Sequence, residues 1–200
     1  GGHARAHAEA MSEVRSIRLI KVYSPNIVHR ETFAREMTYK LGLEVQAMSG
    51  PREVVTGSDI VVAATSSNEP VFCGEWLEPG THVVTARGSE VGMKQWETDK
   101  NTACRADIIV LNSVAPVKEG HLGLLPLLDQ DFLHWGNLFE VTELVLGRCQ
   151  GRSNNQQITV HYNNVGLGIQ FAAIGAIIYE NAKEHGVGTE ISNELFITRQ

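Results

Sequence analysis

Short apolar runs alternate with helix-like patterns through the first half of the chain. Runs rich in β-branched residues and bounded by turn residues predict strands at 17–23, 43–48, 59–64, 82–86 and 107–111. An alanine-rich, charged stretch at 2–15 predicts a helix, and apolar positions at helical spacing predict another from Ile27 to Leu41. Pro51–Gly57 predicts one or two further helical turns. This alternation of strands and helices predicts βαβ units.

The second half of the chain differs from the first in composition and in the pattern of its apolar residues. Residues 113–137 are rich in glycine, proline and leucine and predict a loop with short helices. Residues 138–146 predict a helix that ends at Gly147, and residues 157–162 predict a further strand. Residues 166–185 predict a long helix, apolar on almost every side in its first half. Such a helix is normally buried in a core or in a subunit interface.

The order of these elements indicates an α/β protein with a Rossmann-type, doubly wound parallel sheet. The central runs contain few polar residues, as strands covered on both faces do. An α+β fold with mixed strand pairing is the alternative that the pattern leaves open.

Charge and cysteine content narrow the functional classes. The chain of 200 residues has a formal net charge of -6, without a basic cluster, which argues against a nucleic-acid partner. Its three cysteines are far apart, so we expect reduced thiols and neither a disulfide framework nor a metal site. The longest apolar run is about half of the roughly 20 residues that a membrane span needs. We therefore expect a cytoplasmic protein without a membrane partner.

The first four residues match the end of a phosphate-binding turn. Dinucleotide sites use GxGxxG or GxGxxA between a strand and a helix, whose free N–H groups face the pyrophosphate. Gly1, Gly2, His3 and Ala4 fit the last four positions, and the helix and strand that follow have the expected order. On this interpretation the first strand and first glycine precede Gly1. A frayed end or a cloning remnant is the alternative for two glycines alone.

Polar residues follow two of the predicted strands. Ser24 and Asn26 follow the strand at 17–23, where an acid would favour NAD, and Arg30 lies nearby. This favours NADP(H) over NAD, although Ser24 could be only a turn former and Arg30 only a solvated helix residue. A cluster of hydroxyl groups follows the strand at 59–64, where it would line a ligand crevice or form a simple turn. The cluster consists of Thr65, Ser66 and Ser67.

Two separated stretches carry a resemblance to a known family. Val61–Glu90 and Gly151–Ala182 resemble the ornithine cyclodeaminase/mu-crystallin family, in the right order and across nearly the whole chain. The resemblance implies a homodimer with a Rossmann domain at 1–137, its first strand missing. It implies that residues 138–200 return to a dimerisation and substrate domain. It also implies upstream substrate-binding lysine and arginine residues, so we expect this chain alone to be inactive.

The resemblance assigns roles to individual residues. Glu90 stands where the family has a proton-handling aspartate, and one extra methylene can alter chemistry or substrate size. Lys94 matches a lysine that follows this aspartate in many relatives. Asn164 and Gly166 match a turn that approaches the nicotinamide before the long helix. A loop carboxylate at Glu90 and a solvated side chain at Lys94 are the alternatives.

The family implies three possible functions. The first is hydride transfer at an amino-bearing carbon with loss of ammonia, as in the conversion of ornithine to proline. The second is an NADP(H)-dependent imine reductase or amino-acid dehydrogenase, with a small amino acid or imine as substrate. The third is a mu-crystallin-like protein that binds NAD(P) with little catalysis. The presence of a carboxylate at Glu90 favours an enzyme.

Overall fold

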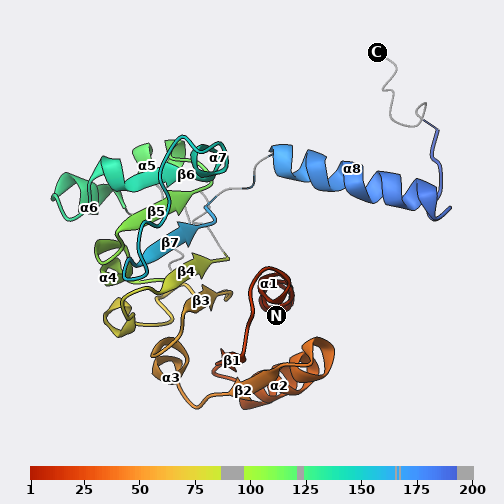
Figure 1. Cartoon of the computed structure of the whole chain (residues 1–200), viewed down its shortest axis with the longest axis horizontal. Helices are drawn as coiled ribbons and strands as arrows, with labels where there is room; N and C mark the ends of the chain where they lie inside the picture. The colour runs from red at the N-terminus through yellow and green to blue at the C-terminus, as the bar shows by residue number, and fades with distance from the viewer. Residues whose placement is uncertain (87–96, 121–123, 165, 167, 193–200) are drawn as a thin grey trace. The chain divides into compact units, whose positions relative to one another are not determined.

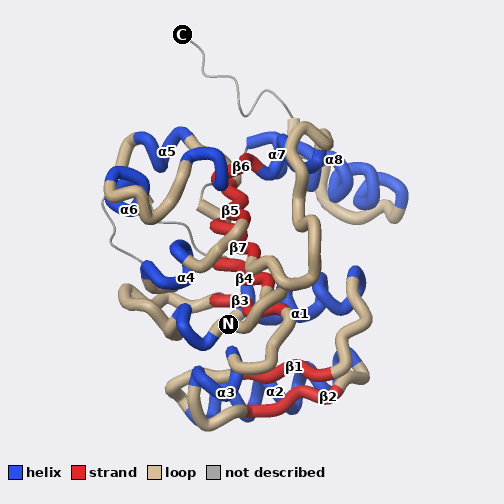
Figure 2. Tube along the Cα trace, turned by 60° about the vertical axis from the view of Figure 1, so that its left-hand side comes forward, coloured by secondary structure: helices blue, strands red, loops and turns tan. Residues whose placement is uncertain are grey.

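The computed structural model describes residues 1–86, 97–120, 124–164, 166 and 168–192. The chain divides into two compact units, Gly1–Val165 and Gly166–Gln200. The first unit contains all the strands of the described residues, and the second contains one long helix. Figures 1 and 2 show the alternation of helices and strands that the sequence predicts.

The first part of the chain forms a small parallel sheet and the helices around it. Strands β1 and β2 pair in parallel, with Leu19 opposite Glu44. Helix α2 begins at Asn26, whose side chain accepts a hydrogen bond from the His29 amide. It ends at Gly42, whose positive φ of 65° suits glycine. The elements are α1 (Gly2–Val14), β1 (Leu19–Val22), α2 (Ile27–Leu41), β2 (Glu44–Ala47) and α3 (Pro51–Val55).

The following part builds a five-stranded parallel sheet with the order β3-β4-β7-β5-β6. Every strand pair in the described residues is parallel, which confirms the Rossmann-type sheet over the α+β alternative. The strands are β3 (Ile60–Ala63), β4 (His82–Thr85), β5 (Ile108–Leu111), β6 (Leu138–Glu140) and β7 (Thr159–Tyr162). The helices among them are η1 (Gly74–Trp76), α4 (Lys100–Cys104), α5 (Ala115–Lys118), α6 (Leu125–Asp129), η3 (Trp135–Asn137) and α7 (Val141–Val145).

The main core lies on one face of this sheet. Val83, Ile109, Leu111 and Val160 have exposures of 0%, and residues of α3, α4, α5 and α6 belong to the same buried cluster. A second, smaller core lies between α2 and β2, with Phe33 and Met37 at its centre and Ala8 of α1 against it. The sheet is therefore held by a large core on one face, and the β1–β2 pair has its own core.

One prediction for the region after residue 137 differs from the structure. The predicted helix at 138–146 is wrong in its first three residues, because β6 pairs there with β5. Glu140 then begins α7 with a capping box that includes Glu143. Strands β6 and β7 both pair within the five-stranded sheet of the first compact unit, and the domain division between 137 and 138 stays a prediction.

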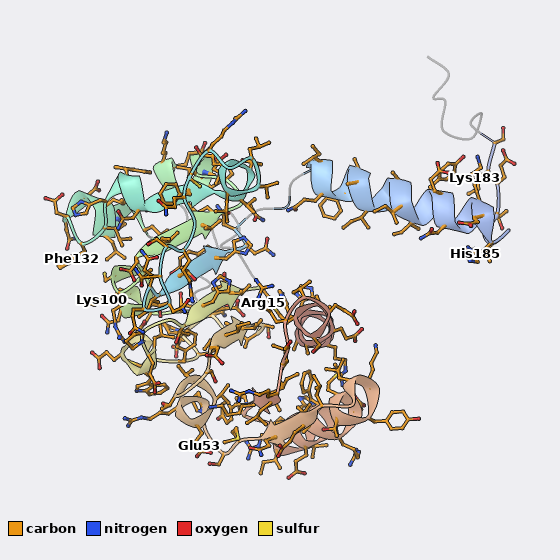
Figure 3. The ribbon with its side chains drawn as sticks, viewed as in Figure 1. Arg15, Glu53, Lys100, Phe132, Lys183 and His185 are labelled. Carbon is orange, nitrogen blue, oxygen red and sulfur yellow. The ribbon has the colours of Figure 1, made fainter. Side chains whose placement is uncertain are left out.

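The second unit contains α8 (Gly168–Glu184), close to the predicted helix at 166–185. Its large apolar side chains are exposed, with values of 74% at Ile169, 71% at Phe171 and 62% at Ile178. Figure 3 shows side chains projecting around this helix and labels Lys183 and His185 towards its end. The expected burial of this helix is therefore not found within the described chain.

Candidate functional site

The carboxyl ends of parallel strands share one edge of the sheet, which is where such folds bind ligands. At this edge, Thr65 follows β3 and is held by a buried acid. Glu97, which is 4% exposed, accepts hydrogen bonds from the Thr65 amide at 2.5 Å and from its hydroxyl at 2.9 Å. The Ser67 amide donates to the Thr65 hydroxyl at 3.2 Å, while Ser66 is exposed. The hydroxyl cluster is therefore a hydrogen-bonded turn held in place by Glu97.

An amide network joins the loops that follow β5 and β7. The Asn164 side chain, buried at 5% exposure, accepts from the Asn112 amide at 2.9 Å and from the Ser113 amide at 3.3 Å. Its nitrogen donates to the Ser113 carbonyl at 2.7 Å. The Asn112 side chain in turn donates to the Asn163 side-chain oxygen at 2.5 Å. Asn164 thus ties the turn after β7, which the sequence predicts to approach the nicotinamide, to the loop after β5 at the same edge of the sheet.

A histidine extends this network beneath the edge. His161 Nε2 lies 3.1 Å from the Asn112 side-chain oxygen, which can only accept, so Nε2 donates. Burial lowers the pKa of His161, and nearby His7 lowers it further. A neutral ring that carries its proton on Nε2 satisfies both observations. His161 is therefore built into the hydrogen-bonding of the loop after β5.

Helix α1 approaches the same region. Burial lowers the pKa of His7, nearby His3 lowers it further, and Glu97 acts in the opposite direction. The charges of Glu97 and His7 therefore act on one another, and α1 also contacts β3 directly. The first turns of α1 thus lie within electrostatic reach of the acid that holds Thr65.

The start of α1 fits a phosphate group. Gly1 is the N-cap residue and makes no side-chain cap bond to the first turn. A Cβ built on Gly1 or Gly2 would meet no atom within 4 Å among the described residues. The first-turn amides of Gly2, His3 and Ala4 receive no side-chain cap at the positive end of this 13-residue helix. This is the arrangement that a pyrophosphate requires.

The positively charged side chain of Arg30 lies at the carboxyl end of β1. Arg30 donates to the Ser24 carbonyl at 3.0 Å, and its guanidinium lies 5.6 Å from the centre of the Tyr23 ring. Arg30 and the backbone of Ser24 are therefore in direct contact. Asn26 is occupied as the cap of α2, because its side-chain oxygen accepts from the His29 amide at 3.2 Å.

The remaining predicted site residues lie outside the described part of the chain or in different compact units. Glu90 and Lys94 lie outside the described residues. Gly166 belongs to the second compact unit, whereas Asn164 belongs to the first. Glu97 and His7 could not be predicted from the sequence, because neither lies in a motif and both act through contacts distant in sequence.

Two further properties concern the described part of the chain as a whole. It contains no group of three or more histidine, cysteine or acidic side chains arranged to hold a metal ion. None of its helices combines the length and hydrophobicity needed to cross a membrane.

The parallel sheet, with α1 against β3, has the Rossmann-type architecture that is typical of dinucleotide-binding proteins. The chain belongs to the ornithine cyclodeaminase/mu-crystallin family, whose family model matches residues 1–186.

Solved structures and a curated relative extend this likeness. A Δ1-pyrroline-2-carboxylate reductase of Thermococcus litoralis, in complex with NADH and L-proline, is 36% identical with a TM-score of 0.84, and the match covers 96% of this chain and 58% of that one. An archaeal alanine dehydrogenase dimer with bound NAD is 26% identical with a TM-score of 0.81, covering 96% and 58%. An uncharacterized cyclodeaminase of Sinorhizobium fredii is 29% identical, covering 94% and 56%. The chain thus spans 56–58% of the length of such curated relatives.

Proposed function

We propose that this chain is the dinucleotide-binding part of an NAD(P)-dependent oxidoreductase that acts on a small amino acid or imine. The observation that carries the proposal is the open start of α1, where the amides of Gly2, His3 and Ala4 are free of a side-chain cap. The relatives named above, which include a reductase and a dehydrogenase that bind NADH or NAD, support the same class of reaction.

Each part of the cofactor has candidate residues on the chain. The amides from Gly1 to Ala4 would hold the pyrophosphate, and the turn from Thr65 to Ser67 would line the crevice beside it. Asn164 and Gly166 would approach the nicotinamide. A bound dinucleotide supplies hydride transfer, and the protein supplies orientation and proton handling. The bonds of Asn164 to the loop after β5 support a rigid wall on that side.

We propose a preference for NADP(H) over NAD. This preference rests on Ser24 and Arg30, because a cation beside a small hydroxyl residue suits the 2′-phosphate of NADP(H). The relatives with NADH and NAD weigh against it. Asn26 would contribute its backbone only, because its side chain caps α2.

For the substrate, we favour the reversible reduction of a small imine or the oxidation of the matching amino acid. Glu90 would act as the proton-transferring carboxylate and Lys94 as its neighbouring cation. Loss of ammonia from ornithine to give proline is the second candidate, which the cyclodeaminase relative supports. Full-length protein would work as a homodimer, and the exposed apolar α8 supports a subunit interface.

Dinucleotide binding by the purified chain tests the central claim. Gly2→Asp places a carboxylate in open space at the start of α1, where it would repel a pyrophosphate without a steric clash. We expect at least a tenfold weaker affinity for NADH and NADPH in a fluorescence titration. Ala10→Asp, at an exposed position of the same helix, is the matched control and should change affinity less than twofold. Equal effects of the two substitutions would remove the helix start from the site.

The cofactor preference has its own test. Arg30→Ala should weaken NADPH binding by about tenfold and leave NADH binding within twofold, because only NADPH carries the 2′-phosphate. The measurement is the ratio of the two dissociation constants in parallel titrations. A loss that is equal for both cofactors would assign Arg30 to the stacking on Tyr23 alone.

A further inference from the structure

A series of side-chain hydrogen bonds joins β7 to the loop after β5 and then to the turn after β7. His161 Nε2 donates to the Asn112 side-chain oxygen at 3.1 Å, and the Asn112 side-chain nitrogen donates to the Asn163 side-chain oxygen at 2.5 Å. The register explains this path, because Leu111 at the end of β5 pairs with Tyr162 at the end of β7. Asn112 and Asn163 are therefore the first residues past the same edge of the sheet.

Each of these bonds determines the direction of the next one. An amide side chain has an accepting oxygen on one side and a donating nitrogen on the other. The proton on His161 Nε2 therefore directs the Asn112 nitrogen towards Asn163, and that nitrogen in turn holds the Asn163 oxygen. The Asn163 nitrogen has no hydrogen-bond partner among the described residues. The series thus ends in two N–H donors that are left for another molecule.

The two asparagines of the turn after β7 have different tasks. Asn164, at 5% exposure, uses its side chain on the backbone of Asn112 and Ser113. Asn163 is exposed, while the side chains that orient it are buried at Asn112 and half-buried at His161. Asn164 therefore holds the turn in place, and Asn163 is the amide side chain that a ligand at this edge can reach.

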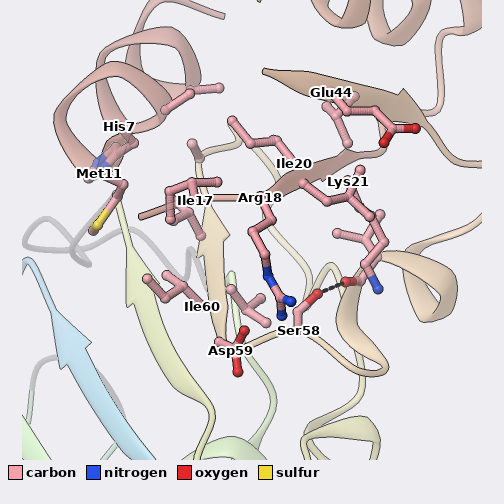
Figure 4. Close-up of a pocket in the computed structure, with 18 of the residues that line it drawn as sticks. His7, Met11, Ile17, Arg18, Ile20, Lys21, Glu44, Ser58, Asp59 and Ile60 are labelled. Atoms are coloured by element: carbon pink, nitrogen blue, oxygen red, sulfur yellow. Dashed lines mark hydrogen bonds between the residues drawn. The ribbon is translucent and has the colours of Figure 1, made fainter. Parts of the chain in front are cut away.

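The network lies apart from the cavity beside α1. That cavity has a volume of about 550 Å³, and its lining comes from residues 4–64 of the described chain. Figure 4 shows His7 and Met11 of α1 around it, together with Ile20 of β1 and Ile60 of β3. Its connection to the network is electrostatic, since His7 lowers the pKa of His161. Substitutions in the network should therefore leave the start of α1 unchanged.

We propose that Asn163 is a ligand-binding residue whose side-chain N–H donates to the carbonyl oxygen of the nicotinamide carboxamide, and that His161 positions it through Asn112. The proposal rests on the proposed function, which assigns the nicotinamide to the turn after β7. A carboxamide oxygen only accepts hydrogen bonds and the open groups of Asn163 only donate them, so the two are complementary. Such a bond restricts rotation of the nicotinamide ring, and orientation of the reacting group is what the protein contributes to hydride transfer.

Paired binding measurements test the contact. ADP-ribose has the pyrophosphate of NADH but lacks the nicotinamide, so it is the matched ligand. Asn163→Ala removes the donors and should weaken NADH binding about fivefold. Asn163→Asp keeps an acceptor for Asn112 but replaces the open donors by an acceptor, and should weaken NADH binding at least tenfold. The affinity of both variants for ADP-ribose should stay within twofold of the unsubstituted chain, measured by isothermal titration calorimetry.

The positioning role of His161 has a separate test. His161→Phe removes the donor to Asn112 and should weaken NADH binding about fivefold, whereas His161→Gln offers an N–H of similar reach and should restore it. Exchange of the Asn112 side-chain amide protons, measured by NMR without a ligand, should be at least tenfold faster in His161→Phe alone. His82→Gln is the matched control, because His82 lies on the same face of the sheet but contacts Thr159.

Several results would overturn the proposal. These are unchanged NADH binding in the Asn163 variants, equal losses for NADH and ADP-ribose, or the same behaviour of His161→Gln and His161→Phe. Because Asn163 is exposed, its variants should fold even where His161→Phe does not. A chain that binds neither NADH nor ADP-ribose would overturn the proposed function as well. Binding of both ligands without an effect of the Asn163 variants would overturn this contact alone.

Discussion

The two faces of the five-stranded sheet carry different chemistry on the same strands. Successive side chains of a strand point to opposite faces, so the strand register divides them into two sets. The apolar face consists of Val61, Ala63, Val83, Thr85, Ile109, Leu111, Val160 and Tyr162. The histidine face consists of Ile60, Val62, His82, Val84, Ile108, Val110, Thr159 and His161.

Helices close one face more completely than the other. The apolar face packs against residues of α3, α4, α5 and α6, and four of its eight residues have an exposure of 0%. On the histidine face, Ile60, Val62, His82 and His161 are only half-buried. The apolar face therefore contributes most of the stability of the sheet. The histidine face combines partial burial with titratable groups, so its contribution should depend on pH.

The largest expected effect is a cavity in the apolar face. Ile109→Ala should lower the free energy of unfolding by about 2–5 kcal/mol, because a fully buried side chain is removed from a close-packed core. Ile60→Ala removes the same atoms from the histidine face, where they are half-buried, and should cost about 1 kcal/mol. Urea unfolding measures both. Equal losses would contradict the difference between the faces.

The next effect concerns pH. Burial lowers the pKa of His82 from its usual value near 6.5 to about 4, with smaller contributions in the same direction from His161 and Arg152. Between these values the unfolded chain binds more protons than the folded one, so stability is lost as the pH falls from 6.5 to 4. The loss should reach about 3 kcal/mol, at 1.36 kcal/mol for each unit of pKa.

The control for this prediction is His82→Gln, which removes the titrating group. The free energy of unfolding of this variant should fall less steeply between pH 6.5 and pH 4, with the remaining slope due to His7 and His161. Parallel pH-dependent unfolding curves for the two proteins would show that His82 is not the group responsible.

The smallest effect separates two threonines. The Thr85 hydroxyl is buried in the apolar face and has no hydrogen-bond partner among the described residues. Thr85→Val should therefore stabilise the chain by about 1 kcal/mol. The Thr159 hydroxyl lies 2.7 Å from His82 Nδ1 and accepts from Arg152 at 3.0 Å, so Thr159→Val should destabilise by about 1–2 kcal/mol. Changes of the same sign in thermal unfolding would contradict this distinction.

How a strand or helix is covered explains which elements the sequence could predict. Strands β3, β4 and β5 were found because strands covered on both faces are continuous apolar runs. Strand β6 was missed because three residues next to a helix are too few to show a period. The helix at α8 was predicted, but its hydrophobicity does not say which polypeptide covers it.

The site was predicted only as far as local motifs reach. The start of α1 and the pair of Ser24 and Arg30 follow from residues close in sequence. The bonds of Glu97 to Thr65 join residues 32 positions apart, and those of Asn164 to Asn112 join residues 52 apart. Such contacts depend on the order of strands in the sheet, which no local pattern contains.

Within the described residues, β1 and β3 each have one edge without a partner strand, which affects how the chain behaves in concentrated solution. Open strand edges recruit strands from other molecules, and folded proteins normally protect them. The chain should therefore aggregate into β-rich precipitates in concentrated solution. A lysine placed on the open edge of β1 would act as a gatekeeper and improve solubility.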